Sequence, residues 1–317
     1  MRELRRDSIT NDIVVIAKNR SNRPIDKFND NDTDSKDDYK LDCPFCRGNE
    51  KYTDSSTFEI KGNSGWLARS VKNKYPIIDS LSKEIYGEHE VIIDTNRHNG
   101  SFYNMSDNEF FYLLKMYKNR YEYMAKNKNI KYISIFKNFL REAGASLTHP
   151  HSQIISLSIV PPEIENEINI SEKYYNKHKK SLYESIIEDE IKYKNRVIHN
   201  HRDYLVMVPE ITKYGGEIRI LFKSNKRFEE IEENNLEELS KIFRKLFKKI
   251  YNIQGYNPFN IYIHTHPLNI PTDKISHYHT HIHIVPRKYN FGGFELGTGV
   301  YVSSINADNL ANKLRFD

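Results

Sequence analysis

A pattern that occurs twice, about 128 residues apart, constrains the fold of this chain more than any other feature. Each copy contains a strand-like run ending in a basic polar turn, a long amphipathic helix pattern, and two further strand-like runs. The first copy reads "HEVIIDTNRHNGSF", a helix pattern from Ser106, "KYISIFKNF" and "HPHSQIISL"; the second reads "GEIRILFKSNKRF", a helix pattern from Phe228, "FNIYIHTHP" and "HTHIHIVPR". The repeat predicts an α+β fold of duplicated halves, each a mostly antiparallel sheet with flanking helices. We expect the halves at 1–169 and 170–317, joined through the polar segment 170–195.

Composition and charge narrow the class of protein. A chain of 317 residues can bury a substantial core, and its formal charge of +5 is spread along the sequence. This modest excess suits a phosphate-bearing ligand but falls short of the basic stripe typical of nucleic-acid-binding proteins. No window has the roughly 18 apolar residues of a membrane span, and the start "MRELRRDSIT" lacks a signal-peptide core. We therefore expect a cytosolic protein with neither a nucleic-acid nor a membrane partner.

Alternating histidines occur at corresponding places in the two copies. Alternate side chains of a strand share a face, so His149 and His151 should point the same way, as should His277, His279, His281 and His283. A lone exposed histidine is usually a polar surface residue, but several in strict alternation favour metal binding or phosphate chemistry.

The two cysteines of the chain, Cys43 and Cys46, form "CPFC". This spacing offers either two thiolates to a zinc ion or a redox dithiol. The motif follows the polar run "NDNDTDSKDDYK" (29–40), predicted as a solvated loop, and does not lie between a strand and a helix as a thioredoxin-like dithiol does. We therefore favour half of a tetrahedral zinc site, which histidines must complete.

Five segments together resemble the galactose-1-phosphate uridylyltransferase family, a branch of the histidine-triad superfamily built from two such halves. They are "RRDSITNDIVVIAKNRSNRP", "CPFCRGNE", "KNFLREAGASLTHPHSQ", "YLVMVP" and "HTHIHIVPR", and they extend over nearly the whole chain. The combination of C-x-x-C with H-P-H-x-Q carries the resemblance. It implies a nucleotidyltransferase that acts on a nucleotide sugar and a sugar 1-phosphate or phosphate, and a homodimer whose chains complete each other's sites.

The resemblance implies that His151 is the nucleophile, attacking the α-phosphorus of the nucleotide sugar to form a covalent nucleotidyl-histidine. Gln153 stands where the hydrolases of the superfamily have a third histidine. A glutamine amide donates a hydrogen bond to a phosphoryl oxygen but has no proton to give away, so it can hold the covalent nucleotide while the leaving group and acceptor exchange. Gln153 therefore indicates a transferase.

The resemblance also implies two metal sites and a set of ligand contacts. Zinc would be held by Cys43, Cys46, His98 and His149, and a second metal, iron or zinc, by Glu167, His264, His281 and His283, with Glu163 and Glu165 as alternatives to Glu167. Arg20 and Arg23 correspond to arginines near the nucleotide and phosphates, where guanidinium groups bind two oxygens at once. Nucleotide or phosphate contacts fall on Asn73, Asn138, Gly144 and Ser146, and a hexose contact falls on Glu295.

Three other functions remain open from the sequence. Ser152 replaces the glycine usual in the uridylyltransferases and resembles a sibling branch of nucleotide-sugar phosphorylases of the ADP-glucose type, which use phosphate as acceptor; "LGTGVYVSS" also lacks the glutamine expected after Glu295. "HTHIHIVPRK" is similar to the motif of histidine-triad nucleotide hydrolases, which would make His281 the nucleophile. A non-catalytic, zinc-stabilised protein that binds nucleotide or RNA is the third, although no RNA-recognition motif is present.

Overall fold

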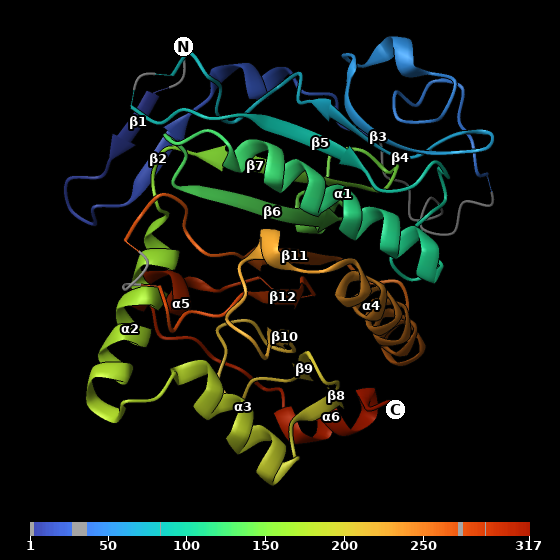
Figure 1. The fold of residues 1–317 in the computed structure, drawn as a ribbon. Coiled ribbons are helices and arrows are strands. Elements are labelled where there is room, and N and C mark those ends of the chain that lie inside the picture. The colour runs from blue at the N-terminus through green and yellow to red at the C-terminus, as the bar shows by residue number, and fades with distance from the viewer. Residues whose placement is uncertain (1–2, 27–36, 83, 272–274, 289) are drawn as a thin grey trace.

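The computed structural model describes residues 3–26, 37–82, 84–271, 275–288 and 290–317, so most of the acidic run at 29–40 lies outside the described residues. Its centre is one ten-stranded sheet in the order β3-β4-β5-β7-β6-β11-β12-β10-β9-β8, in which each neighbouring pair is antiparallel (Figure 1). The strands of this sheet are β3 (Ser56–Gly62), β4 (Gly65–Lys72), β5 (His89–Ile93), β6 (Tyr132–Phe139), β7 (His151–Leu157), β8 (Val197–Asn200), β9 (Tyr204–Met207), β10 (Ile218–Phe222), β11 (Phe259–His264) and β12 (His281–Pro286). A separate hairpin pairs β1 (Glu3–Arg6) with β2 (Ile13–Ile16).

The strand order is the same when read outward from the middle in either direction. The central pair β6 and β11 places Phe136 opposite Tyr262, and beyond it β7 corresponds to β12, β5 to β10, β4 to β9 and β3 to β8. The duplicated pattern of the sequence is therefore a duplicated half-sheet, joined edge to edge. The predicted α+β class with a mostly antiparallel sheet is confirmed.

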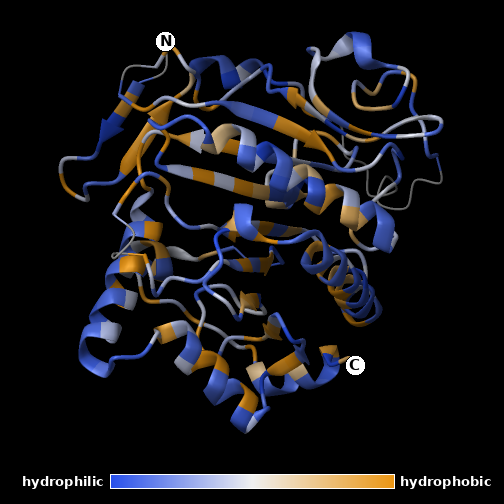
Figure 2. Ribbon diagram, viewed as in Figure 1, coloured by the Kyte–Doolittle hydropathy of each residue, from blue (hydrophilic) through white to orange (hydrophobic). Residues whose placement is uncertain are grey.

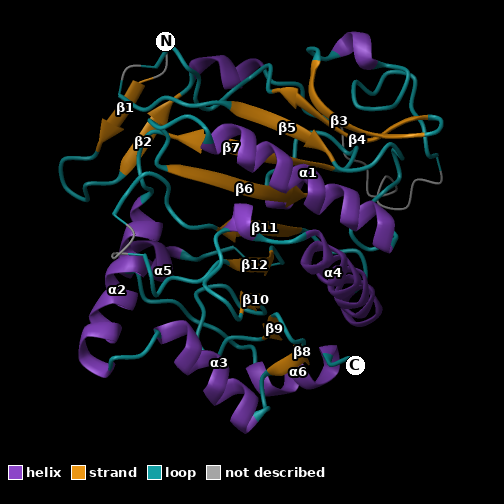
Figure 3. Ribbon diagram, viewed as in Figure 1, coloured by secondary structure: helices purple, strands orange, loops and turns teal. Residues whose placement is uncertain are grey.

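Helices lie against this sheet, as Figure 3 shows. Their bounds are α1 (Asp107–Ala125), α2 (Pro162–His178), α3 (Leu182–Tyr193), α4 (Glu233–Gln254), α5 (Gly293–Thr298) and α6 (Ala307–Leu314). The two predicted helices are α1 and α4; the second begins later than predicted, because the short 3-10 turn Phe228–Glu230 precedes it. The link between the halves, predicted only as a polar segment, also contains α2 and α3, and the predicted boundary at 169/170 falls inside α2.

The main core lies between α1, α4 and one face of the sheet. Phe102, Phe110, Phe243, Phe247 and Phe259 form a buried aromatic cluster that joins the two halves, with ring centroids 5.0–6.4 Å apart. Figure 2 shows the hydrophobic residues along the strands of the sheet. Burial of such rings is the largest single source of stability in a core of this kind. The opposite face of the central strands carries smaller apolar clusters, such as that of Ile78, Ile85 and Ile155, beside polar side chains.

The start of α1 is fixed by its own sequence. The hydroxyl of Ser106 accepts a hydrogen bond from the Glu109 N–H, and the Glu109 carboxylate accepts one from the Ser106 N–H, which makes a capping box. The same carboxylate binds Arg97, in the turn that follows β5. This cap therefore ties the helix that covers the sheet to the turn carrying His98.

None of the described helices combines the length and the apolar character that crossing a bilayer requires. The predicted cytosolic location stays a prediction.

Candidate active site and metal clusters

Strand β7 directs His151 and Gln153 to the face of the sheet opposite α1. Alternation sends Ser152 and Ile154 the other way: Ile154 lies in the main core, and the Ser152 hydroxyl accepts a 2.6 Å hydrogen bond from Tyr117 of α1. His151 and Gln153 thus share one face, together with Val91, which lies opposite Gln153 on β5. The alternation in "HPHSQII" predicted this shared face.

The ring of His151 is held in one tautomer. Its Nδ1 lies 2.9 Å from the His149 carbonyl oxygen, so Nδ1 carries the hydrogen and donates it, and Nε2 keeps a free lone pair. Burial lowers the pKa of His151 to about 4; the positive charge of Lys137 acts in the same direction and the bond to the His149 carbonyl opposes it. The imidazole is therefore neutral at physiological pH, with one nitrogen available as a nucleophile.

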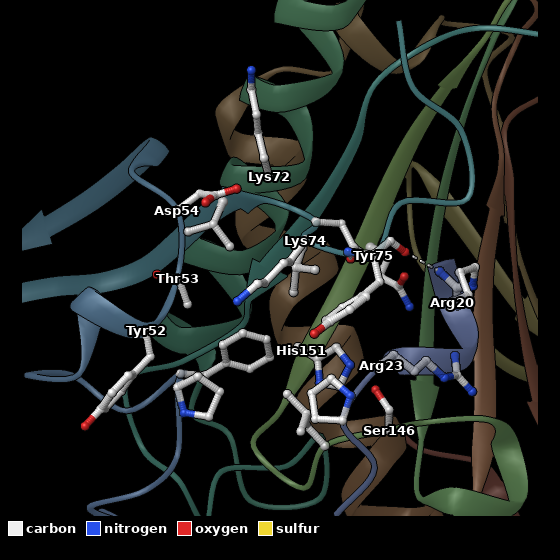
Figure 4. A pocket seen from close by; sticks show the side chains of 18 of the residues that line it. Arg20, Arg23, Tyr52, Thr53, Asp54, Lys72, Lys74, Tyr75, Ser146 and His151 are labelled. Carbon is white, nitrogen blue, oxygen red and sulfur yellow. Dashed lines mark hydrogen bonds between the residues drawn. The ribbon is translucent and has the colours of Figure 1, made fainter. Parts of the chain in front are cut away.

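His151 lines a cavity of about 220 Å³ on this face. Arg20 and Arg23 approach it from one segment, and Lys74 and Tyr75 approach it from the turn after β4, as Figure 4 shows. The Arg20 guanidinium donates a 2.9 Å hydrogen bond to the Tyr75 carbonyl, which ties the two segments together. The cavity brings together most of the residues predicted to contact nucleotide, phosphate or the reacting atoms: Arg20, Arg23, Asn73, Gly144, Ser146, His151 and Gln153.

Asn138 lies beside this cavity and is not among its lining residues. Its Oδ1 accepts a 2.8 Å hydrogen bond from Asn260, so it bridges the seam between β6 and β11, and its side chain lies against Gly144. Gly144 has a φ of 92°, a backbone conformation that residues with a Cβ rarely adopt, and it ends the short turn Arg141–Ala143. The turn 140–146 therefore owes its shape to this glycine.

Glu295, the predicted hexose contact, lies elsewhere in the chain. It belongs to α5 and lines a second cavity of about 160 Å³ with Lys213, Arg287 and Ser303 in the C-terminal half. Its carboxylate accepts a hydrogen bond from the Gly292 N–H. The structure of one chain does not bring Glu295 to the cavity of His151.

Sequence reasoning missed several residues that line the His151 cavity. Phe45 and Tyr52 contribute aromatic surface, Lys74 contributes a positive charge and Asp54 a negative one. Phe45 lies inside the C-x-x-C motif, with its ring 5.6 Å from that of His151. That motif was interpreted only through its cysteines, and no spacing rule marks the other three positions.

The structure brings Cys43, Cys46, His98 and His149 together, with one ligand atom of each within 4.8 Å of the others. The Sγ of Cys46 lies 3.4 Å from Nδ1 of His98 and 3.7 Å from Nδ1 of His149. In a zinc tetrahedron with bonds of about 2.3 Å to sulfur and 2.0 Å to nitrogen, two ligand atoms lie about 3.6 Å apart. The four residues therefore fit a zinc ion.

The far nitrogens of both histidines in this first cluster are occupied. His149 Nε2 lies 2.9 Å from the Thr95 carbonyl, and His98 Nε2 lies 3.4 Å from the Thr148 hydroxyl. Contacts of this kind fix the tautomer of histidines that bind metals and turn the other nitrogen toward the ion. Both Nδ1 atoms therefore face the sulfurs as ligands would.

A second cluster of Glu167, His264, His281 and His283 lies in the C-terminal half. Glu167, on α2, accepts hydrogen bonds from Tyr278 (2.8 Å) and His264 (3.0 Å), and its other neighbour is His281 Nε2 at 3.6 Å. Burial alone would raise the pKa of Glu167, but the hydrogen bond from His264 and the nearby ring of His281 hold it well below its usual value. Of the three candidate glutamates, the structure brings Glu167 to the histidines.

His283 supplies the observation that argues most directly for a metal in the second cluster. Its Nδ1 lies 2.6 Å from the buried carboxylate of Glu217, whereas its Nε2 is buried and has no hydrogen-bond partner among the described residues. A buried nitrogen without a hydrogen-bond partner lowers the stability of the fold unless it binds a cation. The donor set of one carboxylate and three imidazoles suits iron or zinc. Sequence reasoning did not find Glu217.

Comparisons with known proteins identify the family of this chain. A family model described as "Domain of unknown function (DUF4921)" matches residues 77–316. The chain belongs to the DUF4921 family. Its relatives place this member of DUF4921 among the galactose-1-phosphate uridylyltransferase-like proteins, which confirms the resemblance.

The relatives of this DUF4921 chain extend over nearly its full length. ADP-glucose phosphorylase of Arabidopsis thaliana is 28% identical over 329 residues, covering 99% of this chain and 92% of the relative. Galactose-1-phosphate uridylyltransferase of Thermotoga maritima is 25% identical over 336 residues, covering 99% and 98%. The crystal structure of the Arabidopsis thaliana ADP-glucose phosphorylase with bound ADP-glucose superposes with a TM-score of 0.80 at 27% identity, covering 100% and 99%. A uridylyltransferase structure at 22% identity, covering 99% and 97%, shares the fold with a TM-score of 0.79. The chain is accordingly an enzyme of this nucleotidyltransferase-like group.

Proposed function

We propose that this enzyme transfers a nucleoside monophosphate from a nucleotide sugar to a phosphate-bearing acceptor, through a covalent intermediate on His151. The observation that carries the proposal is the placement of His151 and Gln153 on one face of β7, in a cavity with Arg20 and Arg23. A nucleophile with a free Nε2 lone pair beside guanidinium groups and an amide is what phosphoryl transfer to nitrogen requires.

The reaction proceeds in two displacements. In the first, the Nε2 lone pair of His151 attacks the α-phosphorus, an N–P bond forms, and the P–O bond to the sugar phosphate breaks with release of sugar 1-phosphate. In the second, an oxygen of the acceptor attacks the same phosphorus and the N–P bond breaks, which restores the imidazole. The hydrogen stays on Nδ1 and remains bonded to the His149 carbonyl throughout, so the ring needs no proton exchange with solvent.

Charges in the cavity match a diphosphate. Four basic residues line it, Arg20, Arg23, Lys72 and Lys74, and among the described lining residues Asp54 contributes one carboxylate. Guanidinium groups bind two phosphate oxygens at once and so orient the α-phosphorus for attack. Tyr52 and Phe45 offer aromatic surface on which the base can stack.

The proposal also concerns which nucleobase the donor carries and which acceptor takes the nucleotide. We infer phosphorolysis of ADP-glucose, with inorganic phosphate as the acceptor, as the first activity to test. Support comes from Ser152 and from the ADP-glucose phosphorylase of Arabidopsis thaliana, which is similar at 28% identity over nearly the whole chain. Uridylyl transfer from UDP-glucose to a hexose 1-phosphate is the second candidate, supported by the relatives named galactose-1-phosphate uridylyltransferase.

The proposal assigns zinc to Cys43, Cys46, His98 and His149, and a second metal, iron or zinc, to Glu167, His264, His281 and His283. Bound zinc would supply no reacting group; it would fix the motif that carries Phe45 to the end of β7, next to His151. The second cluster also bears on the hydrolase alternative, because His281 Nε2 lies 3.6 Å from the Glu167 carboxylate and His281 belongs to the group of four candidate ligands. His281 is therefore assigned to metal binding.

The proposal includes a homodimer in which a second copy of the chain brings its Glu295 to the hexose. Exposed apolar side chains surround Glu295: Phe294, Leu296 and Val302 leave 56–74% of their surface to solvent. Such a patch on one chain is typical of a surface that another chain covers. The separation of Glu295 from His151 within one chain agrees with a site completed by the partner.

Intact-protein mass spectrometry tests the proposal. The protein is incubated separately with ADP-glucose, UDP-glucose and GDP-mannose, beside the His151→Gly variant. We expect an added nucleoside monophosphate that is absent from the variant, and inorganic phosphate should discharge an adenylyl adduct as ADP. No adduct with any of the donors would overturn the covalent mechanism, and discharge only by hexose 1-phosphate would overturn the phosphorylase assignment.

A further inference from the structure

His89, the first residue of β5, is a buried histidine outside both metal clusters. Its Nε2 lies 2.9 Å from Oε1 of Gln153 and 3.0 Å from Nδ2 of Asn73, and its Nδ1 lies 2.9 Å from the backbone nitrogen of Ile77. The side chain leaves 4% of its surface to solvent. It therefore joins the strand of the nucleophile to the turn that carries Lys74 and Tyr75.

The partners of His89 determine its tautomer. The Ile77 N–H can only donate, so Nδ1 of His89 must accept and its hydrogen must sit on Nε2. The Asn73 oxygen already accepts a 2.8 Å hydrogen bond from the Tyr75 N–H, so Asn73 presents its NH₂ group to His89. Asn73 therefore offers no acceptor to the His89 Nε2–H, so its 3.0 Å contact with Nε2 is not a hydrogen bond. Of the two side-chain contacts described for this nitrogen, the Gln153 oxygen at 2.9 Å is the one that can accept.

The hydrogen on His89 Nε2 fixes which end of the Gln153 amide faces the cavity. With Oε1 bound to His89, both hydrogens of the Gln153 NH₂ group are left for the cavity that this residue lines. No described residue accepts a hydrogen bond from that nitrogen. A flipped amide would instead present its oxygen to an anionic phosphoryl group and repel it.

The duplicated half supplies an internal comparison. On β5, Val91 lies opposite Gln153; on β10, Arg219 lies opposite His283. Two residues earlier stand His89, the first residue of β5, and Glu217, the residue just before β10. Glu217 accepts from the Nδ1–H of His283 at 2.6 Å. In both halves, the side chain at this position orients the third residue of the alternating motif.

We propose that His89 is a positioning residue for the transfer, which holds the Gln153 amide with its NH₂ group toward the phosphoryl oxygens and, through Ile77, fixes the adjoining turn of the cavity. The inference rests on the proposed function for its catalytic consequence. Its structural part, the tautomer of His89 and the orientation of Gln153, stands independently.

Two substitutions distinguish the acceptor role of His89 Nδ1 from the donor role of its Nε2. In His89→Asn the side-chain oxygen can replace Nδ1 as acceptor for Ile77, but the donor to Gln153 is lost. In His89→Gln the amide nitrogen can replace Nε2 as donor. We expect His89→Asn to lower the rate of nucleotidyl-His151 formation roughly 10- to 100-fold with little change in KM, and His89→Gln to recover most of that rate.

A double-mutant cycle distinguishes positioning from a general structural effect. If His89 acts through Gln153, then His89→Asn should lower the rate no further in a Gln153→Ala background. His199→Asn, the same substitution at a histidine that binds the Phe316 carbonyl away from the cavity, should leave the rate unchanged. Independent, additive losses from His89→Asn and Gln153→Ala would overturn the positioning role.

The tautomer of His89 can be measured without an assay of enzymatic activity. Nitrogen-15 NMR of the histidine rings, with His89 assigned by its loss in His89→Asn, should show a hydrogen on Nε2 and none on Nδ1. A hydrogen on Nδ1 would overturn the orientation of Gln153. An absent adduct in the unsubstituted protein would instead overturn the proposed function and the catalytic consequence, while the NMR result still decides the orientation.

Discussion

Lys137 and Asp94 form an ion pair, with 2.6 Å between Nζ and Oδ2, that is almost completely excluded from solvent behind the strand of the nucleophile. Lys137 also donates to the His151 carbonyl at 3.1 Å, and the other Asp94 oxygen accepts from Ser152 at 2.7 Å. The pair therefore holds the carbonyl of His151 and the side chain of Ser152, from the face opposite the cavity.

Replacing Lys137 with Met should be strongly destabilising, because it leaves the Asp94 carboxylate buried without its partner. Removing one member of a buried pair costs about 3–5 kcal/mol, and equilibrium unfolding in urea measures the change. Lys241→Met, which breaks an exposed pair with Glu238, is the control and should cost about 1 kcal/mol or less. Equal effects of the two substitutions would show that the Lys137 pair does not contribute in this way.

Ser152→Gly should cost about 1–3 kcal/mol, because it leaves the Tyr117 hydroxyl and one Asp94 oxygen buried with one partner fewer. Tyr117→Phe removes one side of the same contact. The loss from Ser152→Gly should therefore be smaller in the Tyr117→Phe background, which a double-mutant cycle of unfolding free energies measures. Strict additivity would argue against a connected network.

The sequence predicted those parts of the fold and site that follow from local periodicity. Alternation placed His151 and Gln153 on one face, and the repeat led to the two half-sheets. The sequence could not show that His89 contacts Gln153 or that Glu217 contacts His283, because these contacts join segments that are distant in the chain. It also could not choose among Glu163, Glu165 and Glu167, since that depends on the rotation of α2, a helix that the polar composition of the segment concealed.

Glu167→Ala should remove the metal of the second cluster, whereas Glu163→Ala should leave it bound. Both glutamates lie on α2, but Glu163 is exposed and paired with Lys213, while Glu167 meets His264 and His281. Inductively coupled plasma mass spectrometry of the purified variants measures metal per chain. Loss of metal in both variants, or in neither, would contradict the assignment of Glu167.

Cys46→Ser should lose zinc from the first cluster and lower the midpoint of thermal unfolding. The hydrogen bonds from Cys43, His149 and His98 lower the pKa of the Cys46 thiol, which favours the thiolate form that binds zinc. The same metal analysis, repeated after dialysis against a chelator, reports the loss, and the second cluster should keep its metal in this variant. Zinc retained at the level of the unsubstituted protein would place it elsewhere.

Mixing two inactive variants tests whether Glu295 acts on the site of a second chain. In a dimer of one His151→Gly chain and one Glu295→Ala chain, a shared arrangement leaves one site with both native residues and the other with neither. Differently tagged chains, co-expressed and purified through both tags, should then show about half of the activity of the unsubstituted dimer. If Glu295 served the His151 of its own chain, every site of this mixed dimer would lack one residue. Its activity would then not exceed half that of the Glu295→Ala dimer, a result that would reject the shared site while leaving the chemistry at His151 intact.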